Sequence, residues 1–107
     1  MLKREDILNK SDIKEEVIEV PEWGGKIKVK SLSGDEYVDL VEACMVQGGL
    51  SYKLLYPMLI QVATIEPEFE KGDVDSLRRK NAGALERICK EILDLSGIDM
   101  GGNLKNL

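Results

Sequence analysis

The stretch from Asp73 to Gly97 decides the fold, and it reads DVDSLRRKNAGALERICKEILDLSG. Its apolar residues recur at steps of three, four and seven, which is the spacing of one face of an α-helix. They are Val74, Leu77, Ala84, Leu85, Ile88, Ile92 and Leu95. Charged residues occupy the opposite face. The spacing predicts one continuous helix over 73–96, a rod of roughly 36 Å.

Both ends of this predicted helix carry boundary signals. Asp73 can accept hydrogen bonds from the free N–H groups of the first turn, and Gly97 suits the left-handed position that follows a helix. Because ordering so many residues costs more free energy than one apolar stripe returns, the helix requires a facing surface. The apolar run from Leu54 to Ile65 offers that surface.

The first third of the chain predicts a β-hairpin with strands over 14–20 and 26–31. In both segments apolar residues alternate with charged residues, which is typical of strands with one buried face. Gly24-Gly25 permits the positive φ values of a tight turn between the strands. An isolated hairpin is marginally stable in water, so its apolar face must pack on the helices. The lysine-rich second strand would discourage edge-to-edge association if it lay at an edge of the sheet.

The alternation also predicts the register of this hairpin. Pairing Val20 with Ile27, and Ile18 with Val29, collects the apolar side chains of both strands on one face. The same register sets Glu19 opposite a lysine. A shift by one residue would place a lysine opposite Val20, so the pattern opposes that shift.

Two further helices are expected between the hairpin and the long helix. Ser33-Gly-Asp-Glu36 is a capping box, and it opens a helix over 34–47 that Gly48-Gly49 ends. The segment 51–65 is apolar on nearly all sides, as in a helix that lies inside a protein. Pro57 removes one backbone hydrogen bond within it, so this helix should bend or restart there.

The expected fold is therefore α+β, with the hairpin packed on three helices over 34–47, 51–65 and 73–96. A length of 107 residues suits one domain over 1–107. The segments 1–12 and 99–107 are expected to be flexible tails. The first holds few apolar residues, and the second contains Gly101-Gly102.

Composition argues against several classes of function. The chain has 20 acidic and 15 basic residues and a net charge of −5, which disfavours nonspecific binding to nucleic acid. We interpret the basic cluster Arg78-Arg79-Lys80 as a solvated helix face. The longest apolar run falls short of the roughly 20 residues that cross a bilayer, and Met1–Lys10 lacks the apolar region of a signal peptide. We expect a cytoplasmic protein that contacts neither nucleic acid nor membrane.

The residue types for catalysis or metal binding are also scarce. There is no histidine, so the commonest general base and metal ligand is missing. Cys44 and Cys89 lie near apolar helix faces and are expected to be buried free thiols, with a disulfide or a functional thiol as alternatives. The carboxylates between Glu66 and Asp75 lack calcium-loop spacing and are interpreted as a solvated connection. We expect no enzymatic activity, no cofactor and no metal.

Large apolar and aromatic residues are the candidate partner contacts. They are Trp23, Tyr52, Tyr56, Met58 and Phe69. Trp23 lies at the tip of the hairpin, where it can either fold over the turn glycines or stand exposed as an anchor for a partner. Each of the five can instead belong to the core. The small residues after Asn81 allow close approach by a helix of this chain or of another protein.

A series of short motifs follows along the chain: Val20-Pro-Glu-Trp-Gly-Gly25, Leu32-Ser-Gly-Asp-Glu36, Glu66-Pro-Glu-Phe69, Asp73-Val-Asp-Ser-Leu77 and Lys80-Asn-Ala-Gly-Ala84. Their order and spacing resemble those of small tail assembly chaperones of bacteriophages and prophages of Gram-positive hosts. The resemblance extends over roughly residues 7–97. The order of the motifs carries it, because each motif alone is common.

The resemblance implies a non-catalytic chaperone in the host cytoplasm. Such proteins bind the tape measure protein, keep it soluble and help deliver it to polymerising major tail protein. They leave before the virion is complete, and a ribosomal frameshift often produces a longer second form. The resemblance implies no catalytic residues, and it leaves a homo-oligomer open.

Two other classes of protein compete with this interpretation. A small virion structural protein of the tail or the head–tail connector would copurify with finished particles, whereas a chaperone would not. A DNA-binding regulator would need a positive face despite the net charge of −5.

Overall fold

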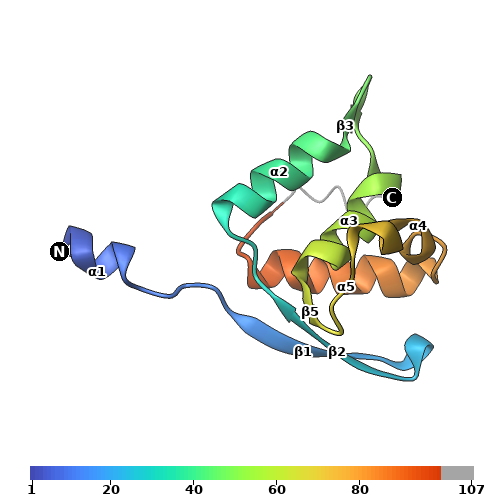
Figure 1. Ribbon diagram of the computed structural model, residues 1–107, viewed down its shortest axis with the longest axis horizontal. Coiled ribbons are helices and arrows are strands. Elements are labelled where there is room, and N and C mark those ends of the chain that lie inside the picture. The colour runs from blue at the N-terminus through green and yellow to red at the C-terminus, as the bar shows by residue number, and fades with distance from the viewer. Residues whose placement is uncertain (100–107) are drawn as a thin grey trace.

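The computed structural model describes residues 1–99 and has an α+β fold (Figure 1). The helices are α1 (Arg4–Leu8), α2 (Gly34–Cys44), α3 (Tyr52–Ala63), α4 (Val74–Leu77) and α5 (Ala82–Leu95). The strands are β1 (Glu15–Val20), β2 (Gly25–Lys30), β3 (Met45–Val46), β4 (Gly49–Leu50) and β5 (Thr64–Glu66). Two 3-10 turns complete it, η1 (Pro21–Trp23) and η2 (Lys71–Asp73). The predicted tail over 99–107 lies, apart from its first residue, outside the described residues.

Three strands form an antiparallel sheet in the order β1–β2–β5. The hairpin β1–β2 was predicted, whereas β5 follows directly after α3 and was not. The lysine-rich strand β2 therefore lies in the centre of the sheet. The outer strand on its other side is β1, which carries Glu15, Glu16 and Glu19. Negative charge along this edge opposes pairing with a second copy of the same strand.

The register of the hairpin differs from the predicted one by two residues. Ile18 lies opposite Ile27, and Val20 lies opposite Gly25. The cause is the turn, in which η1 and Gly24 at a φ of 77° reverse the chain early enough for Gly25 to pair. A shift of two residues keeps each side chain on its face. The same apolar residues therefore stay buried together, and α5 packs on the sheet that holds them: Ile18, Val20, Ile27 and Val29.

The single long helix predicted over 73–96 is wrong, because the structure divides it in two. α4 ends at Leu77, and α5 begins at Ala82 after a short turn. The side-chain Oδ1 of Asn81 accepts a hydrogen bond from the backbone N–H of Ala84 at 3.0 Å, so Asn81 caps a new helix. An asparagine that interrupts an apolar stripe was thus the signal for a boundary.

The division also changes what the two halves contact. The Asp73 carboxylate accepts a hydrogen bond from the Glu70 backbone N–H at 2.8 Å, within the η2 turn, and does not cap α4 as predicted. Leu77 is buried, and α4 packs against α3. α5 fills the centre of the core with its own stripe, which comprises Ala84, Leu85, Ile88, Cys89, Ile92 and Leu93.

The other end of α5 is formed as predicted. Gly97 has a φ of 72°, and its N–H donates to the carbonyl of Asp94 at 3.1 Å. The N–H of Ile98 donates to the carbonyl of Leu93 at 2.9 Å. These two bonds form a Schellman motif, and Ile98 packs back against the core.

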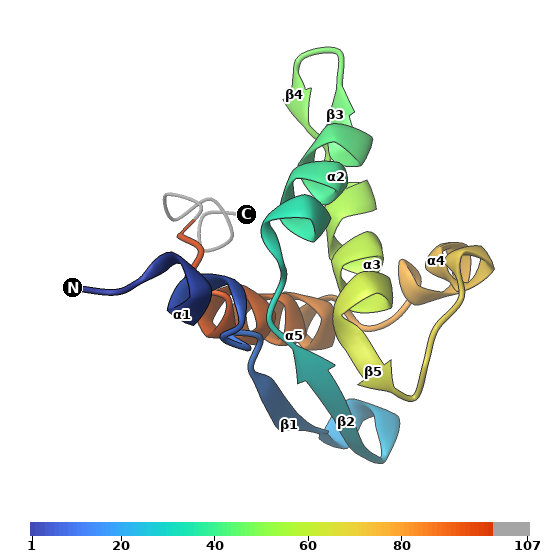
Figure 2. The ribbon, with the colours of Figure 1, turned by 60° about the vertical axis from the view of Figure 1, so that its left-hand side comes forward.

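Helix α2 begins at the predicted capping box. Ser33 Oγ accepts a hydrogen bond from the Glu36 N–H at 3.2 Å, and the Glu36 carboxylate accepts one from the Ser33 N–H at 3.0 Å. The helix ends at Cys44 and not at residue 47. Residues 45–50 instead form the small hairpin β3–β4, whose two glycines have positive φ values. Figure 2 shows this hairpin projecting beyond α2 and α3.

Helix α3 is shorter than the predicted segment 51–65, because Thr64 already belongs to β5. It continues through Pro57 and does not restart there. Proline leaves the carbonyl four residues earlier without its helical donor, and this carbonyl belongs to Lys53. Lys53 is exposed, so water can take the place of the missing donor.

Candidate docking groove

The five predicted partner contacts are half-buried and pack against the core: Trp23, Tyr52, Tyr56, Met58 and Phe69. They come from three places in the fold. One lies in η1, three lie along α3, and Phe69 lies in the loop before η2. The carbonyl of Phe69 accepts a hydrogen bond from the side chain of Gln61 at 3.2 Å, which ties this loop to α3.

Trp23 is held in place by an ion pair at its neighbouring residue. The guanidinium of Arg87, on α5, donates hydrogen bonds of 2.8 and 2.7 Å to the two carboxylate oxygens of Glu22. These bonds lower the pKa of Glu22 from 4.5 to about 2, so the pair is charged at neutral pH. The pair fastens η1 to α5 and thereby seats Trp23 against the core.

Tyr52 and Tyr56 form a ring contact on α3, with centroids 6.2 Å apart. Burial raises the pKa of Tyr56 to about 12, and the negative charge of Glu86 adds to the rise. The phenol therefore stays protonated at neutral pH. The two thiols behave in the same way, because Cys44 and Cys89 are free and buried as predicted, and burial raises the pKa of both.

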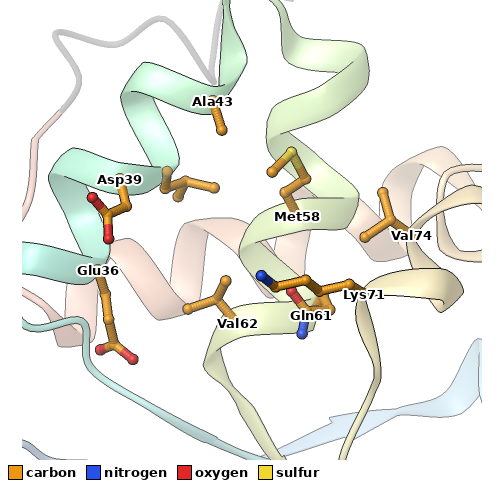
Figure 3. Close-up of a pocket in the computed structure, with 9 residues that line it drawn as sticks. Glu36, Asp39, Ala43, Met58, Gln61, Val62, Lys71 and Val74 are labelled. Carbon is orange, nitrogen blue, oxygen red and sulfur yellow. The ribbon is translucent and has the colours of Figure 1, made fainter.

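A groove lies between α2 and α3, and residues of η2 and α4 line its remaining side (Figure 3). Its volume is about 490 Å³. Its apolar lining consists of Leu40, Ala43, Met58, Val62 and Val74. Its polar lining consists of Glu36, Asp39, Gln61 and Lys71. We call this site the α2–α3 groove.

The two helices contribute different chemistry to the α2–α3 groove. Met58 and Val62 project into it from α3, and Ala43 faces them from α2 (Figure 3). Below this floor, the buried thiol of Cys44 lies 3.8 Å from the sulfur of Met58. The polar residues of α2 on this side are acidic, and Lys71 supplies a cation from the opposite wall.

Glu36 is fixed at one end of the groove. Lys30 Nζ lies 2.6 Å from both carboxylate oxygens of Glu36. Partial burial by itself raises the pKa of Glu36, but the hydrogen bonds from Lys30 and Ser33 outweigh burial, and the pKa is lowered overall. The carboxylate is therefore ionised at neutral pH. It holds the first turn of α2 in place, so this wall of the groove is formed before any partner arrives.

The lining of the groove suits binding. Apolar side chains on facing helices, with charged groups at the rim, match the needs of an amphipathic helix that must bury one face. Within residues 1–99, no three His, Cys, Asp or Glu side chains are grouped so that they can hold a metal ion.

The most exposed apolar residues were not among the predicted contacts. One group lies on the N-terminal segment, one lies on α2 and β3, and one further residue lies on β1: Leu2, Ile7 and Leu8, then Val38, Met45 and Val46, then Val17. The first group lies in a segment that was predicted to be a flexible tail, and the second lies within the helix that was predicted over 34–47.

Comparisons with known proteins reveal no relative. No protein-family model, curated protein or solved structure matches the chain. Among residues 1–99, no helix has both the length and the apolar character needed to cross a bilayer. Function is therefore inferred from the groove and from the resemblance of the motifs.

Proposed function

We propose that this protein is a non-catalytic chaperone of phage tail assembly, which binds helical segments of the tape measure protein in the α2–α3 groove. The observation that carries the proposal is an apolar groove between two helices, open to solvent, in a chain with a net charge of −5. A tape measure protein is long, helical and apolar along its seam, so it aggregates when it is alone. A groove of this kind can cover such a seam.

The dimensions of the groove determine how much of a client one copy covers. The lining residues of α2 run from Glu36 to Ala43, which corresponds to about 11 Å of helix. One copy therefore covers roughly two turns of a bound helix. A long client needs many copies along its length, and the acidic exterior keeps the resulting complex soluble.

The charges at the rim indicate which client segments fit best. Asp39 lies on the α2 side beside Glu36, whose charge Lys30 already pairs, and Lys71 lies opposite. An amphipathic helix with basic residues on one flank of its apolar face complements this arrangement. The proposal places the protein in the host cytoplasm and outside the mature virion, with the major tail protein as a second partner.

The test is co-expression with the adjacent tape measure protein, with the soluble fraction of that protein as the readout. Ala43→Arg fills the groove from an exposed position, so the fold should tolerate it. Val38→Arg is the matched control. Val38 is exposed on the same helix and lies outside the groove, and the substitution introduces the same charge. We expect the native chain and Val38→Arg to keep the client soluble, and Ala43→Arg to lose this effect.

Two results would overturn the proposal. One is a client whose solubility is the same with and without this chain. The other is this chain in purified, finished virions at a fixed ratio to tail proteins, which would identify a structural component of the tail or the connector.

A further inference from the structure

The α2–α3 groove has two walls, and they differ in charge. Helix α3 forms the floor with Met58 and Val62, α2 forms one wall, and η2 with the start of α4 forms the other (Figure 3). Both α2 and α4 pack against α3, so the two walls are held in place by the core. A helix that binds along the floor therefore presents one flank to each wall.

The charge available on the α2 wall is that of Asp39. Two carboxylates line this wall, but the carboxylate of Glu36 is already paired, since Lys30 Nζ lies 2.6 Å from it. Asp39 is exposed, and among the described residues its carboxylate has no ion-pair partner. Helix α2 contains no basic residue, so nothing on the same helix offsets this charge.

The charge available on the opposite wall is that of Lys71. Figure 3 shows its side chain extending over the groove from η2, and no residue in the described part of the chain forms an ion pair with it. Its acidic neighbours are engaged elsewhere and do not line the groove. The carboxylate of Asp73 accepts a hydrogen bond from the N–H of Glu70 at 2.8 Å. Asp75 Oδ1 lies 3.0 Å from Arg78 Nε.

Opposite charges on the two walls distinguish the two directions in which a helix can lie. When an amphipathic helix keeps its apolar face on the floor and is turned end for end, its two flanks exchange walls. A helix with one basic flank and one acidic flank therefore satisfies both Asp39 and Lys71 in one direction only. In the other direction each wall meets a like charge, which is unfavourable.

We infer that the α2–α3 groove binds its client helices in one direction, with a basic flank against Asp39 and an acidic flank against Lys71. This inference rests on the proposed function, because it concerns how the same groove holds the same client. It has a consequence for a long client whose helices keep the same flank basic. Copies of the protein then point in one direction along that client, whereas a groove with uncharged walls would bind either way round.

Two designed peptides of two heptads each test the inference without the natural client. They have the same composition and the same apolar residues at positions a and d, but one has Lys at e and Glu at g, and the other has Glu at e and Lys at g. Each carries a nitroxide label at its N-terminus. The readout is the broadening of backbone amide NMR signals at the two ends of the α2 wall, Glu36 and Ala43.

We expect both peptides to bind the native chain and to lie in opposite directions. The label of one peptide should broaden the Glu36 end of the wall, and the label of the other should broaden the Ala43 end. The preference for one direction should be roughly tenfold, because each wall replaces a repulsive surface contact with an attractive one. It should weaken in about 1 M salt, which screens exposed charges.

The double variant Asp39→Lys/Lys71→Glu exchanges the charges of the two walls and leaves the net charge unchanged. Each peptide should reverse its direction on this variant. Glu42→Lys/Lys80→Glu is the matched control, because both residues are exposed and lie outside the groove. On the control variant each peptide should keep the direction that it has on the native chain.

The possible failures are distinguishable. If the peptides bind the native chain equally in both directions, or keep their direction on Asp39→Lys/Lys71→Glu, the inference is wrong, although the groove still takes an amphipathic helix. If neither peptide broadens the signals of the groove residues, the groove does not bind such helices, and the proposed function fails together with the inference.

Discussion

Helices α5 and α1 show two outcomes for apolar side chains on a helix. Both helices have signals that begin them, but the apolar residues of α5 recur at helical spacing, whereas Ile7 and Leu8 of α1 are adjacent in the sequence. α5 buries six residues between the sheet and α3, whereas α1 leaves Ile7 and Leu8 in solvent. The presence of apolar side chains therefore determines only that a helix has apolar surface to cover. It does not determine whether the same chain or another molecule covers that face.

The largest effect should come from truncating the central residue of α5. Ile88 is fully buried, so Ile88→Ala should lower the free energy of unfolding by about 2–5 kcal/mol. Ile7→Ala, the same change on α1, should alter it by less than about 0.5 kcal/mol. Urea denaturation at a concentration where the chain is monomeric measures both. Equal losses would mean that α1 belongs to the core of its own copy.

A smaller effect should follow from removing the cap that separates α4 from α5. Asn81→Ala removes the acceptor for the Ala84 N–H and should cost about 1 kcal/mol. Asn81→Ser keeps a capping oxygen and should remain within a few tenths of a kcal/mol of the native chain. Thermal unfolding followed by circular dichroism measures the difference. If both variants match the native chain, the division of the long helix does not depend on this cap.

The Schellman motif at the end of α5 should be comparably sensitive. Gly97→Ala puts a side chain at a φ of 72°, which should cost about 1 kcal/mol. Gly34→Ala is the control, because its site is open and lies in the first turn of α2, so it should be neutral or slightly stabilising. Denaturant titration measures the free energy of unfolding of both variants. If Gly34→Ala lost more stability than Gly97→Ala, the left-handed residue at position 97 would be dispensable.

The smallest effect concerns the ion pair that fastens η1 to α5. The lowered pKa of Glu22 means that the pair stabilises the fold above pH 4.5, and that this contribution is lost as the pH falls towards about 2. Carboxyl carbon NMR shifts should place the pKa of Glu22 near 2 in the native chain. In Arg87→Gln the pKa should return towards 4.5. An unchanged pKa in Arg87→Gln would assign the shift to another group.

Local patterns predicted some features correctly. The capping box at Ser33, the left-handed Gly97 and the buried face of the hairpin each depend on residues that are near one another in sequence. Such features depend on short-range hydrogen bonds and on alternation, which the residues themselves specify.

Other features could not be read from the same patterns. The register of the hairpin depended on how many residues the turn consumes, and two registers that differ by two residues bury the same faces. The apolar stripe from Val74 to Leu95 fits one helix as well as two, and the cap at Asn81 decided between them. Strand β5 was hidden in the end of an apolar helix, because short apolar runs suit both structures.

The candidate site shows the same limit. Met58 was a predicted contact and lines the groove, but its facing residues Ala43 and Val74 lie on other elements and have no unusual pattern in the sequence. They meet Met58 because α2 and α4 both pack against α3.

The sequence by itself determined the α+β composition, the apolar faces and the signals at most helix ends, because these depend on residues within a few positions of one another. Only the tertiary structure decided where the long stripe divides, which strand lies in the centre of the sheet and which apolar residues stay in solvent. These outcomes depend on which surfaces, distant in the chain, pack against one another. The local patterns are compatible with more than one such arrangement.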